Sequence, residues 1–400
     1  MGAARLDNAT ARRLFLDRHA LLAAPTGPGK GADLLSLIRA LGFVQIDSVC
    51  TVERAHHMIL HARRTSYRPH HLAPLIERER ALFEHWTHDA AVIPMTFPAH
   101  WQLRFARDTD RLRQKWSTQR RPGYEAECAT VTRRIRTTGP ARSDHFAERG
   151  LGKTVDGWWD WHPGKTALEY LWRNGTLAVS AREGFRKVYD LAENVYPACP
   201  TPPEAETIHW ACISALDRLG FATSGELAAF WALITPAEAR AWCADALARG
   251  EVAEIEVRSA DGTWRRHFAL PYTLAKAQSL PAAPNMIRVL SPFDPALRDR
   301  KRTQRLFGFD YRIEIFTPAP QRKYGYYVFP LLQDDRLIGR IDMAADKPAR
   351  QLCITALWPE PGLRFGATRQ AQLNAGLLRT ARLAGLESLQ WKDGWLKPPP

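Results

Sequence analysis

Cysteine is scarce in this sequence and long apolar runs are missing. The six cysteines are scattered over 400 residues without a Cys-x-x-Cys pair, which gives no indication of a disulfide framework. The apolar stretches, such as Tyr326–Leu332, are far shorter than the roughly 18 residues that span a bilayer. The first residues carry several arginines and no signal-peptide pattern. We therefore expect a soluble, cytoplasmic protein without a membrane partner.

Acidic side chains are in the minority. The chain has 42 Asp and Glu residues against 56 Lys and Arg residues, a formal net charge of +14. Such an excess is typical of proteins that neutralise phosphates, although many arginines in other proteins only solvate the surface. A chain of this length has room for two to four domains.

The first predicted domain, 1–122, contains two helices and an extended segment. Apolar residues recur at helical spacing from Asn8 to Leu22 and from Leu34 to Leu41. Gly42 stops the second helix, and Phe43–Val49 alternates like a short strand or extended loop. This alternation predicts that Gln45 and Asp47 project from one face.

Two similar units follow, each with three predicted helices and a β-hairpin. Leu171–Val179 and Leu247–Ile255 occupy equivalent places in the two units, which indicates an internal repeat. This order of elements is typical of a winged helix, whose third helix can enter the major groove. We predict winged-helix domains at 123–196 and 204–284. Winged helices also serve as protein–protein modules, and that alternative remains open at this point.

The C-terminal part changes to β character. Its predicted strands are Tyr311–Phe316, Tyr326–Pro330, Arg336–Met343 and Gln351–Trp358, and a helix follows at about Thr368–Leu383. We predict a β-barrel-like domain with a terminal helix over 285–400. The predicted fold class is therefore α+β, with tandem winged helices followed by this domain.

Histidines cluster in the first third of the chain. None forms a His-Glu-x-x-His motif and no cysteine pair accompanies them, so we predict no metal site and no cofactor. The clustered residues are His56, His57, His61, His70, His71, His85 and His88.

Five segments, taken together and in order, resemble a known family. They are Leu41–Val49, Glu84–His88 with Ile93-Pro94, Ser291–Pro295 with Asp299-Arg300, Leu306–Glu314, and Lys323–Tyr327. Over nearly the whole chain they resemble the YcaQ/AlkZ-like winged-helix DNA glycosylases. The resemblance implies winged helices around a DNA-binding concavity, a C-terminal β-barrel, and hydrolysis of the N-glycosidic bond of alkylated bases.

The Gln45-Ile46-Asp47 tripeptide narrows this resemblance. Members of the family carry Gln-x-Gln or Gln-x-Asp, and Gln-x-Asp resembles the YcaQ branch, which is associated with N7-alkylated purines and DNA interstrand crosslinks. The implied partner is double-stranded DNA with alkylated or crosslinked bases. Outside this family context, an aspartate at the end of a strand is more often a turn or cap residue.

The chemistry of such lesions suits a carboxylate. Alkylation at N7 makes the base a good leaving group, so the difficulty lies in the electron-poor sugar of the oxocarbenium-like transition state. We expect Asp47 to stabilise that charge and to activate water. Gln45, which can donate and accept hydrogen bonds, is expected to position the water, the deoxyribose or the lesion.

Further site residues are predicted from the same segments. Trp86 and His88 are candidates to line the lesion site, although a buried supporting aromatic is an equal alternative for Trp86. Phosphate contacts are predicted from basic residues that could also form an ordinary solvated face: Arg63, Arg64, Arg68, Lys165, Arg182, Arg186 and Lys187. No lysine stands out as a Schiff-base nucleophile, so we expect a monofunctional enzyme. We also expect a monomer that is associated with the nucleoid.

Two other classes of protein would share these features. A winged-helix transcription regulator would use the same helices without chemistry at Gln45 and Asp47, but the sequence shows no heptad pattern for dimerisation. A partner-binding scaffold would show no salt-dependent affinity for DNA.

Overall fold

The computed structural model describes residues 4–118, 123–146 and 163–399, and the chain forms two compact units. The first unit combines Met1–His71 with Ala211–Pro400, and the second comprises Leu72–Trp210. The boundary after His71 falls inside the predicted first domain, 1–122. The four-domain division remains a prediction.

Helices of the first unit begin where the sequence supplies caps. Thr223 and Thr235 each accept a hydrogen bond from the backbone of a glutamate three residues later, whose side chain binds the cap in return. These capping boxes satisfy amide groups that the helix leaves unpaired. The helices are α1 (Asn8–Arg18), α2 (Gly31–Leu41), α3 (Ala55–His61), α10 (Ser224–Trp231), α11 (Pro236–Ala248), α12 (Thr273–Gln278), α13 (Arg300–Phe307) and α14 (Ala367–Leu383). Helix α9 (Glu204–Leu219) begins in the second unit and ends in the first.

Two sheets belong to this unit. The smaller has the order β1-β8-β9, with β1 parallel to β8. The larger has the order β10-β11-β12-β13-β14, and its last pair is parallel. The strands are β1 (Ala4–Leu6), β8 (Ala253–Arg258), β9 (Trp264–Ala269), β10 (Ile287–Val289), β11 (Val328–Gln333), β12 (Arg336–Asp346), β13 (Gln351–Pro359) and β14 (Ser388–Trp391).

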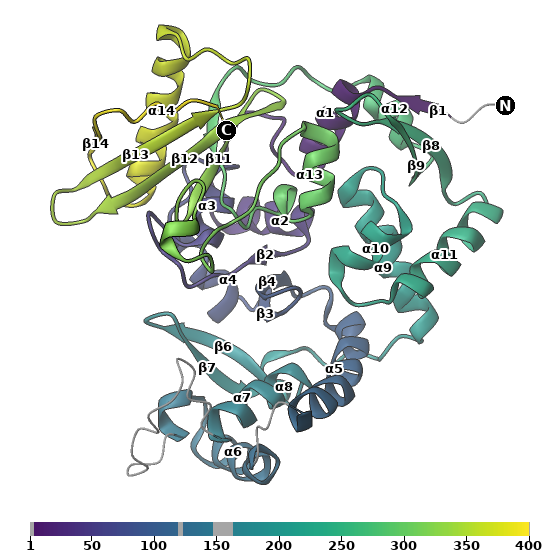
Figure 1. The fold of residues 1–400 in the computed structure, drawn as a ribbon. Coiled ribbons are helices and arrows are strands. Elements are labelled where there is room, and N and C mark those ends of the chain that lie inside the picture. Colours follow the sequence, from purple (N-terminus) through teal and green to yellow (C-terminus); the bar gives the residue numbers. More distant parts are fainter. Residues whose placement is uncertain (1–3, 119–122, 147–162, 400) are drawn as a thin grey trace. The chain divides into compact units, whose positions relative to one another are not determined.

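The larger sheet is a half-barrel, which corrects the predicted barrel-like closure. Strands β10 and β14 are its two edges and do not pair with each other. Helix α14 packs against both edge strands (Figure 1), so the apolar face is covered without closure of the sheet.

The predicted strand Tyr311–Phe316 is wrong, because this segment has no ladder partner and forms a closed loop. The Tyr311 hydroxyl donates to the carbonyl of Val328 at 2.6 Å. The Glu314 carboxylate accepts hydrogen bonds from backbone N–H groups nine to eleven residues further along the chain. These bonds bend the segment back on itself and prevent it from pairing as a strand.

The second unit contains helices followed by a β-hairpin, as the sequence predicts for its central part. Its strands have the order β4-β3-β6-β7-β5. The elements are α4 (Ala73–Glu77), β3 (Leu82–Trp86), β4 (Ala90–Pro94), α5 (Pro98–Thr118), α6 (Tyr124–Thr138), β5 (Ala141–Arg142), α7 (Pro163–Arg173), β6 (Leu177–Glu183), β7 (Arg186–Leu191) and α8 (Ala192–Val195). The winged-helix arrangement itself remains a prediction.

Candidate active site

The Gln45-Ile46-Asp47 tripeptide begins four residues after Leu41, the last residue of α2. Gly42 ends that helix with φ at 86°, and a Cβ on this residue would lie 2.7 Å from a ring carbon of Trp231. Phe43 is buried against the same indole, with ring centroids 5.8 Å apart. Glycine is therefore needed where the chain turns into β2 (Val44–Gln45).

Gln45 and Asp47 differ in their surroundings. Gln45 lies in β2 with 7% of its surface exposed. Asp47 follows the strand, is half-buried, and accepts a hydrogen bond from the backbone N–H of Val49 through Oδ1 at 2.7 Å. The strand is thus shorter than the predicted extended segment, and a side-chain turn fixes the carboxylate.

The loop after the tripeptide is tied to the half-barrel sheet. The carbonyl of Thr51 accepts a hydrogen bond from the N–H of Ala345 in β12 at 2.7 Å. Segments almost 300 residues apart in the sequence are therefore held together beside Asp47.

Tyr327, which precedes β11, is a site residue that the sequence reasoning missed. Its side chain is 1% exposed, and a side-chain hydrogen bond links its hydroxyl to Ser291. Burial and then the negative charge of Asp47 raise the pKa of Tyr327 above its usual range. Near neutral pH the phenol is therefore a neutral donor in the field of the carboxylate. The only signal in the sequence was its position in Lys323–Tyr327, a segment quoted for the family resemblance.

Similarity to known proteins identifies the family and the fold of this chain. The chain matches the family described as DNA glycosylase AlkZ-like over residues 38–383. The chain belongs to this family. Its structure is similar to that of Streptomyces sahachiroi DNA glycosylase AlkZ, with a TM-score of 0.65 and 14% sequence identity over 98% of this chain and 100% of that chain. This likeness establishes the mixed α+β fold, and the family match supports a DNA repair glycosylase.

The other lesion-site candidates of this AlkZ-like chain belong to the second unit. Trp86 is half-buried at the end of β3, with the Arg173 guanidinium 4.2 Å from its ring centroid. His88 is exposed in the turn before β4. In the same segment, His85 is fully buried and accepts a hydrogen bond from the Trp101 indole N–H at 3.1 Å. Its other nitrogen lies 2.9 Å from the carbonyl of Trp172. His85 therefore has a structural role.

Arg63 does not lie where a phosphate contact needs it, which corrects its prediction. The side chain is 0% exposed and binds both carboxylate oxygens of Asp294, at 2.7 and 2.9 Å. It also donates to the carbonyls of His19 and Ile59. Asp294 in turn accepts from the N–H of Ala296 and caps a short 3-10 helix. This part of the Ser291–Pro295 segment therefore joins α3 to the C-terminal half of the unit.

Replacing Arg63 by alanine is expected to destabilise the protein by about 3–5 kcal/mol, because Asp294 would be left as a buried, unpaired charge. Arg64→Ala is the control, since the Arg64–Asp33 pair is partly exposed and such pairs contribute about 1 kcal/mol or less. Urea unfolding of both variants measures the difference. Equal stability of the two variants would contradict the structural role.

The remaining candidates for phosphate contact fall into two groups, those paired with other protein groups and those that are exposed. Arg68 donates to the carbonyls of Thr65 and Tyr67, Arg182 forms a bidentate pair with Glu84, and Lys187 lies 3.6 Å from Glu169. Lys165 is exposed, and Arg186 is exposed although paired with Asp144. Phosphate contact by these residues remains a prediction, favoured most for Lys165 and Arg186.

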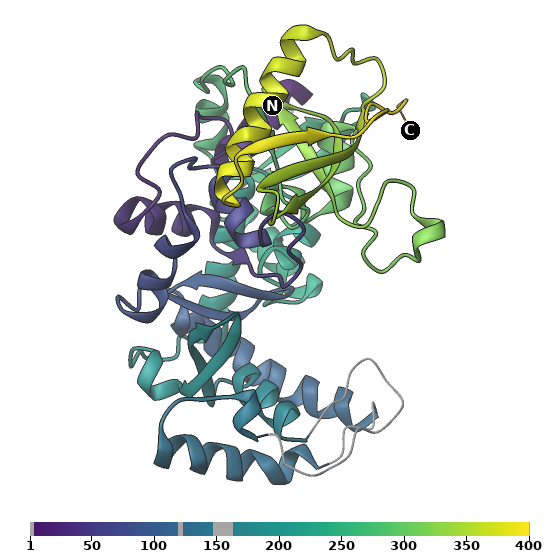
Figure 2. The same ribbon diagram turned by 90° about the vertical axis from the view of Figure 1, so that its left-hand side faces the viewer.

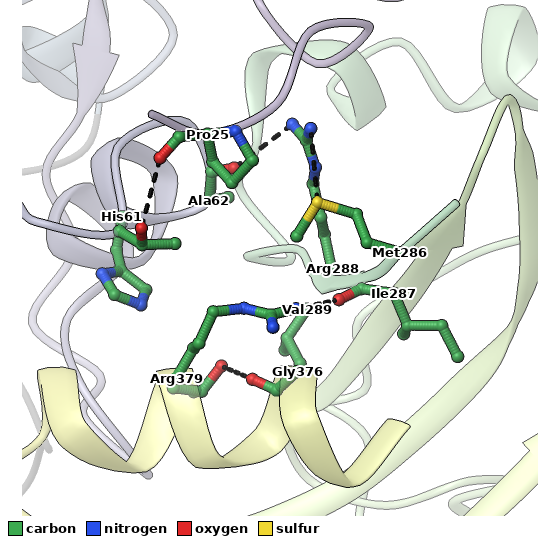
Figure 3. Close-up of a pocket in the computed structure, with 11 residues that line it drawn as sticks. Pro25, His61, Ala62, Met286, Ile287, Arg288, Val289, Gly376 and Arg379 are labelled. Carbon is green, nitrogen blue, oxygen red and sulfur yellow. Dashed lines mark hydrogen bonds between the residues drawn. The ribbon is translucent and has the colours of Figure 1, made fainter. Parts of the chain in front are cut away.

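A small cavity lies between α3, β10 and α14 (Figure 3). His61, Arg288 and Arg379 are among its lining residues, and the Arg379 guanidinium donates to the carbonyl of Ile287. Its volume is about 20 Å³, which is enough for one water molecule and too small for a purine. This cavity is not a lesion pocket.

The described residues offer neither a metal site nor a membrane-spanning helix. Among residues 4–118, 123–146 and 163–399, no three His, Cys, Asp or Glu side chains are grouped as a metal would require. Within the same ranges, each helix is too short or too polar to cross a bilayer.

Proposed function

We propose that this chain hydrolyses the N-glycosidic bond of N7-alkylated purines in duplex DNA and unhooks interstrand crosslinks formed through such bases. The observation that carries the proposal is the half-buried Asp47 carboxylate, fixed by the N–H of Val49 at 2.7 Å directly after the strand that buries Gln45. Membership of the AlkZ-like glycosylase family and the net charge of +14 support it.

In this mechanism Asp47 supplies negative charge where the sugar becomes positive. The carboxylate stabilises the oxocarbenium-like transition state and accepts a proton from the attacking water. Gln45 orients the water or the deoxyribose through its amide. Tyr327 donates a hydrogen bond to the water or to the carboxylate itself.

The arrangement on DNA is part of the proposal. We assign DNA contact to winged helices, among them the one built from α6, α7 and the β6–β7 hairpin, with Lys165 and Arg186 facing phosphates. The enzyme acts as a monofunctional, monomeric glycosylase on chromosomal DNA in the cytoplasm.

The proposal is tested with duplex DNA that contains 7-methylguanine. After incubation with the full chain, heating in alkali is expected to break the strand at each site from which the base has been released. A second duplex with a nitrogen-mustard crosslink is expected to separate into single strands. Specific binding without strand breaks would instead identify a transcription regulator, and the absence of salt-dependent DNA binding would identify a scaffold.

Tyr327→Phe is expected to separate activity from stability. Loss of the hydroxyl is expected to slow single-turnover base release roughly 10- to 100-fold, as for a hydrogen bond to a charged group. Thermal stability is expected to change little, because phenylalanine keeps the buried ring and its packing. Tyr326→Phe is the matched control, since the Tyr326 side chain is 42% exposed. Unchanged activity of Tyr327→Phe would rule out this role.

A further inference from the structure

Phe316 is unusually exposed for a phenylalanine. Its relative exposure is 91%, against 38–51% for the other large hydrophobic residues that are exposed in the described parts of the chain. A single exposed apolar side chain is common on protein surfaces. What distinguishes Phe316 is that the loop around it is ordered.

The Phe316 loop, defined here as residues 312–326, is closed by Glu314. One carboxylate oxygen accepts the N–H of Lys323 at 2.8 Å, and the other accepts the N–H groups of Tyr324 and Gly325 at 2.8 and 3.1 Å. The loop thus has a fixed base, although it contains no strand.

The tip of the loop is also internally bonded. The N–H of Thr317 donates to the carbonyl of Glu314 at 3.0 Å, and Nε of Arg322 donates to the carbonyl of Thr317 at 2.8 Å. Pro318 and Pro320 restrict the backbone further. These contacts fix the residues on both sides of Phe316 while its ring remains in solvent.

Both ends of the loop are anchored in the half-barrel sheet. Tyr311, just before it, is bonded to Val328 of β11. Near the other end, the Tyr324 ring contacts Trp358 of β13 with centroids 5.4 Å apart. Figure 2 shows the segment as a green arm that projects from the sheet. The loop continues directly into Tyr327, the buried phenol of the candidate active site.

The charge on this arm matches a polyanion. Arg312 and Lys323 are exposed, and the Arg322 guanidinium lies 5.0 Å from the ring centroid of Tyr326. The loop has one acidic side chain, Glu314, and its carboxylate accepts hydrogen bonds from backbone N–H groups of the loop itself. An aromatic tip surrounded by cations suits DNA, because phosphates attract the cations and bases stack on the ring.

We propose that Phe316 is a wedge that inserts between base pairs of duplex DNA next to the nucleotide held at Asp47. The proposal rests on the proposed function and deepens it by naming the element that unstacks the substrate. An apolar wedge replaces the stacking that a base step loses when it opens. Because the loop is already ordered, little conformational entropy is lost on insertion.

The test measures unstacking and affinity, and it does not require catalysis. The probe is a duplex with a tetrahydrofuran abasic analogue and 2-aminopurine as the adjacent base, whose fluorescence rises when stacking is lost. The full chain is compared with Phe316→Ala, Phe316→Trp and Leu396→Ala, the last being a control at another exposed apolar residue. Thermal unfolding of each variant verifies that the fold is intact.

Wild type, Phe316→Trp and Leu396→Ala are expected to raise the fluorescence on binding. Phe316→Ala is expected to lose most of this rise and to bind roughly 10-fold more weakly. Its slope of affinity against salt concentration is expected to stay unchanged, because the cations remain. Equal fluorescence and affinity of wild type and Phe316→Ala would overturn the wedge.

The two proposals fail in different ways. Unstacking by a wild-type chain that releases no base would refute the glycosylase and leave the wedge standing. Release of 7-methylguanine at equal rates by wild type and Phe316→Ala, without a difference in fluorescence, would refute the wedge and leave the glycosylase.

Discussion

Asp47→Asn is expected to slow base release from 7-methylguanine DNA roughly 100- to 1,000-fold, with DNA affinity kept. Asparagine has nearly the same shape, and its side-chain oxygen can still accept the N–H of Val49, so the turn persists. What is lost is the negative charge that faces the developing oxocarbenium ion. Single-turnover kinetics and a separate binding measurement distinguish the two effects.

Two further variants serve as controls for Asp47→Asn. Gln45→Ala is expected to reduce the rate less, because a positioning group is removed and the charge remains. Ser48→Ala changes an exposed neighbour and is expected to leave the rate unchanged. Equal activity of Asp47→Asn and wild type at neutral pH would remove Asp47 from the mechanism.

The second large effect is loss of stability in mild acid. Burial is the main cause that lowers the pKa of three histidines of the first unit from 6.5, to about 3 for His19 and about 4 for His57 and His61. All three are at most 9% exposed. They are therefore neutral in the folded protein over a range of pH in which an unfolded chain binds protons.

The direction of the effect follows from proton linkage. The stabilisation is fully present above pH 6.5 and is lost as the pH falls toward 4, because the unfolded state takes up more protons there. Over this window each histidine lowers the free energy of unfolding by about 3 kcal/mol. Domains have only about 5–15 kcal/mol of stability in total, so we expect unfolding of the first unit between pH 6.5 and 4.

Circular dichroism during acid titration measures this transition. His61→Leu removes one titrating group from the cavity of Figure 3, which the His61 side chain lines. The variant is expected to shift the midpoint to lower pH, whereas His70→Leu, at an exposed position, is expected to leave it unchanged. Full stability of wild type at pH 4 would contradict the prediction.

The positions where helices begin and end could be predicted from the sequence. The helix from Asn8 and the stop at Gly42 both occur as expected. The tripeptide was found because its neighbours resemble a family, since Gln-x-Asp by itself has no distinctive spacing. Each of these signals lies within a few residues of the feature that it predicts.

Long-range pairing could not be predicted in the same way. Arg63 is of the residue type that contacts phosphates, but Asp294, 231 positions further along the chain, forms an ion pair with it inside the protein. Tyr311–Phe316 has the composition of a strand, but Glu314 closes it into a loop through backbone groups further along the chain. A cation on the surface and one in a buried ion pair look alike in a sequence.

The sequence by itself determined the family, the positions of most helices and strands, and Gln45 and Asp47 as the residues to test. Only the tertiary structure buried Tyr327 and Arg63 and left the half-barrel open under α14. Helix periods, caps and turns depend on neighbouring residues. The partners of a charge, a hydroxyl or a strand edge are fixed when distant segments pack together.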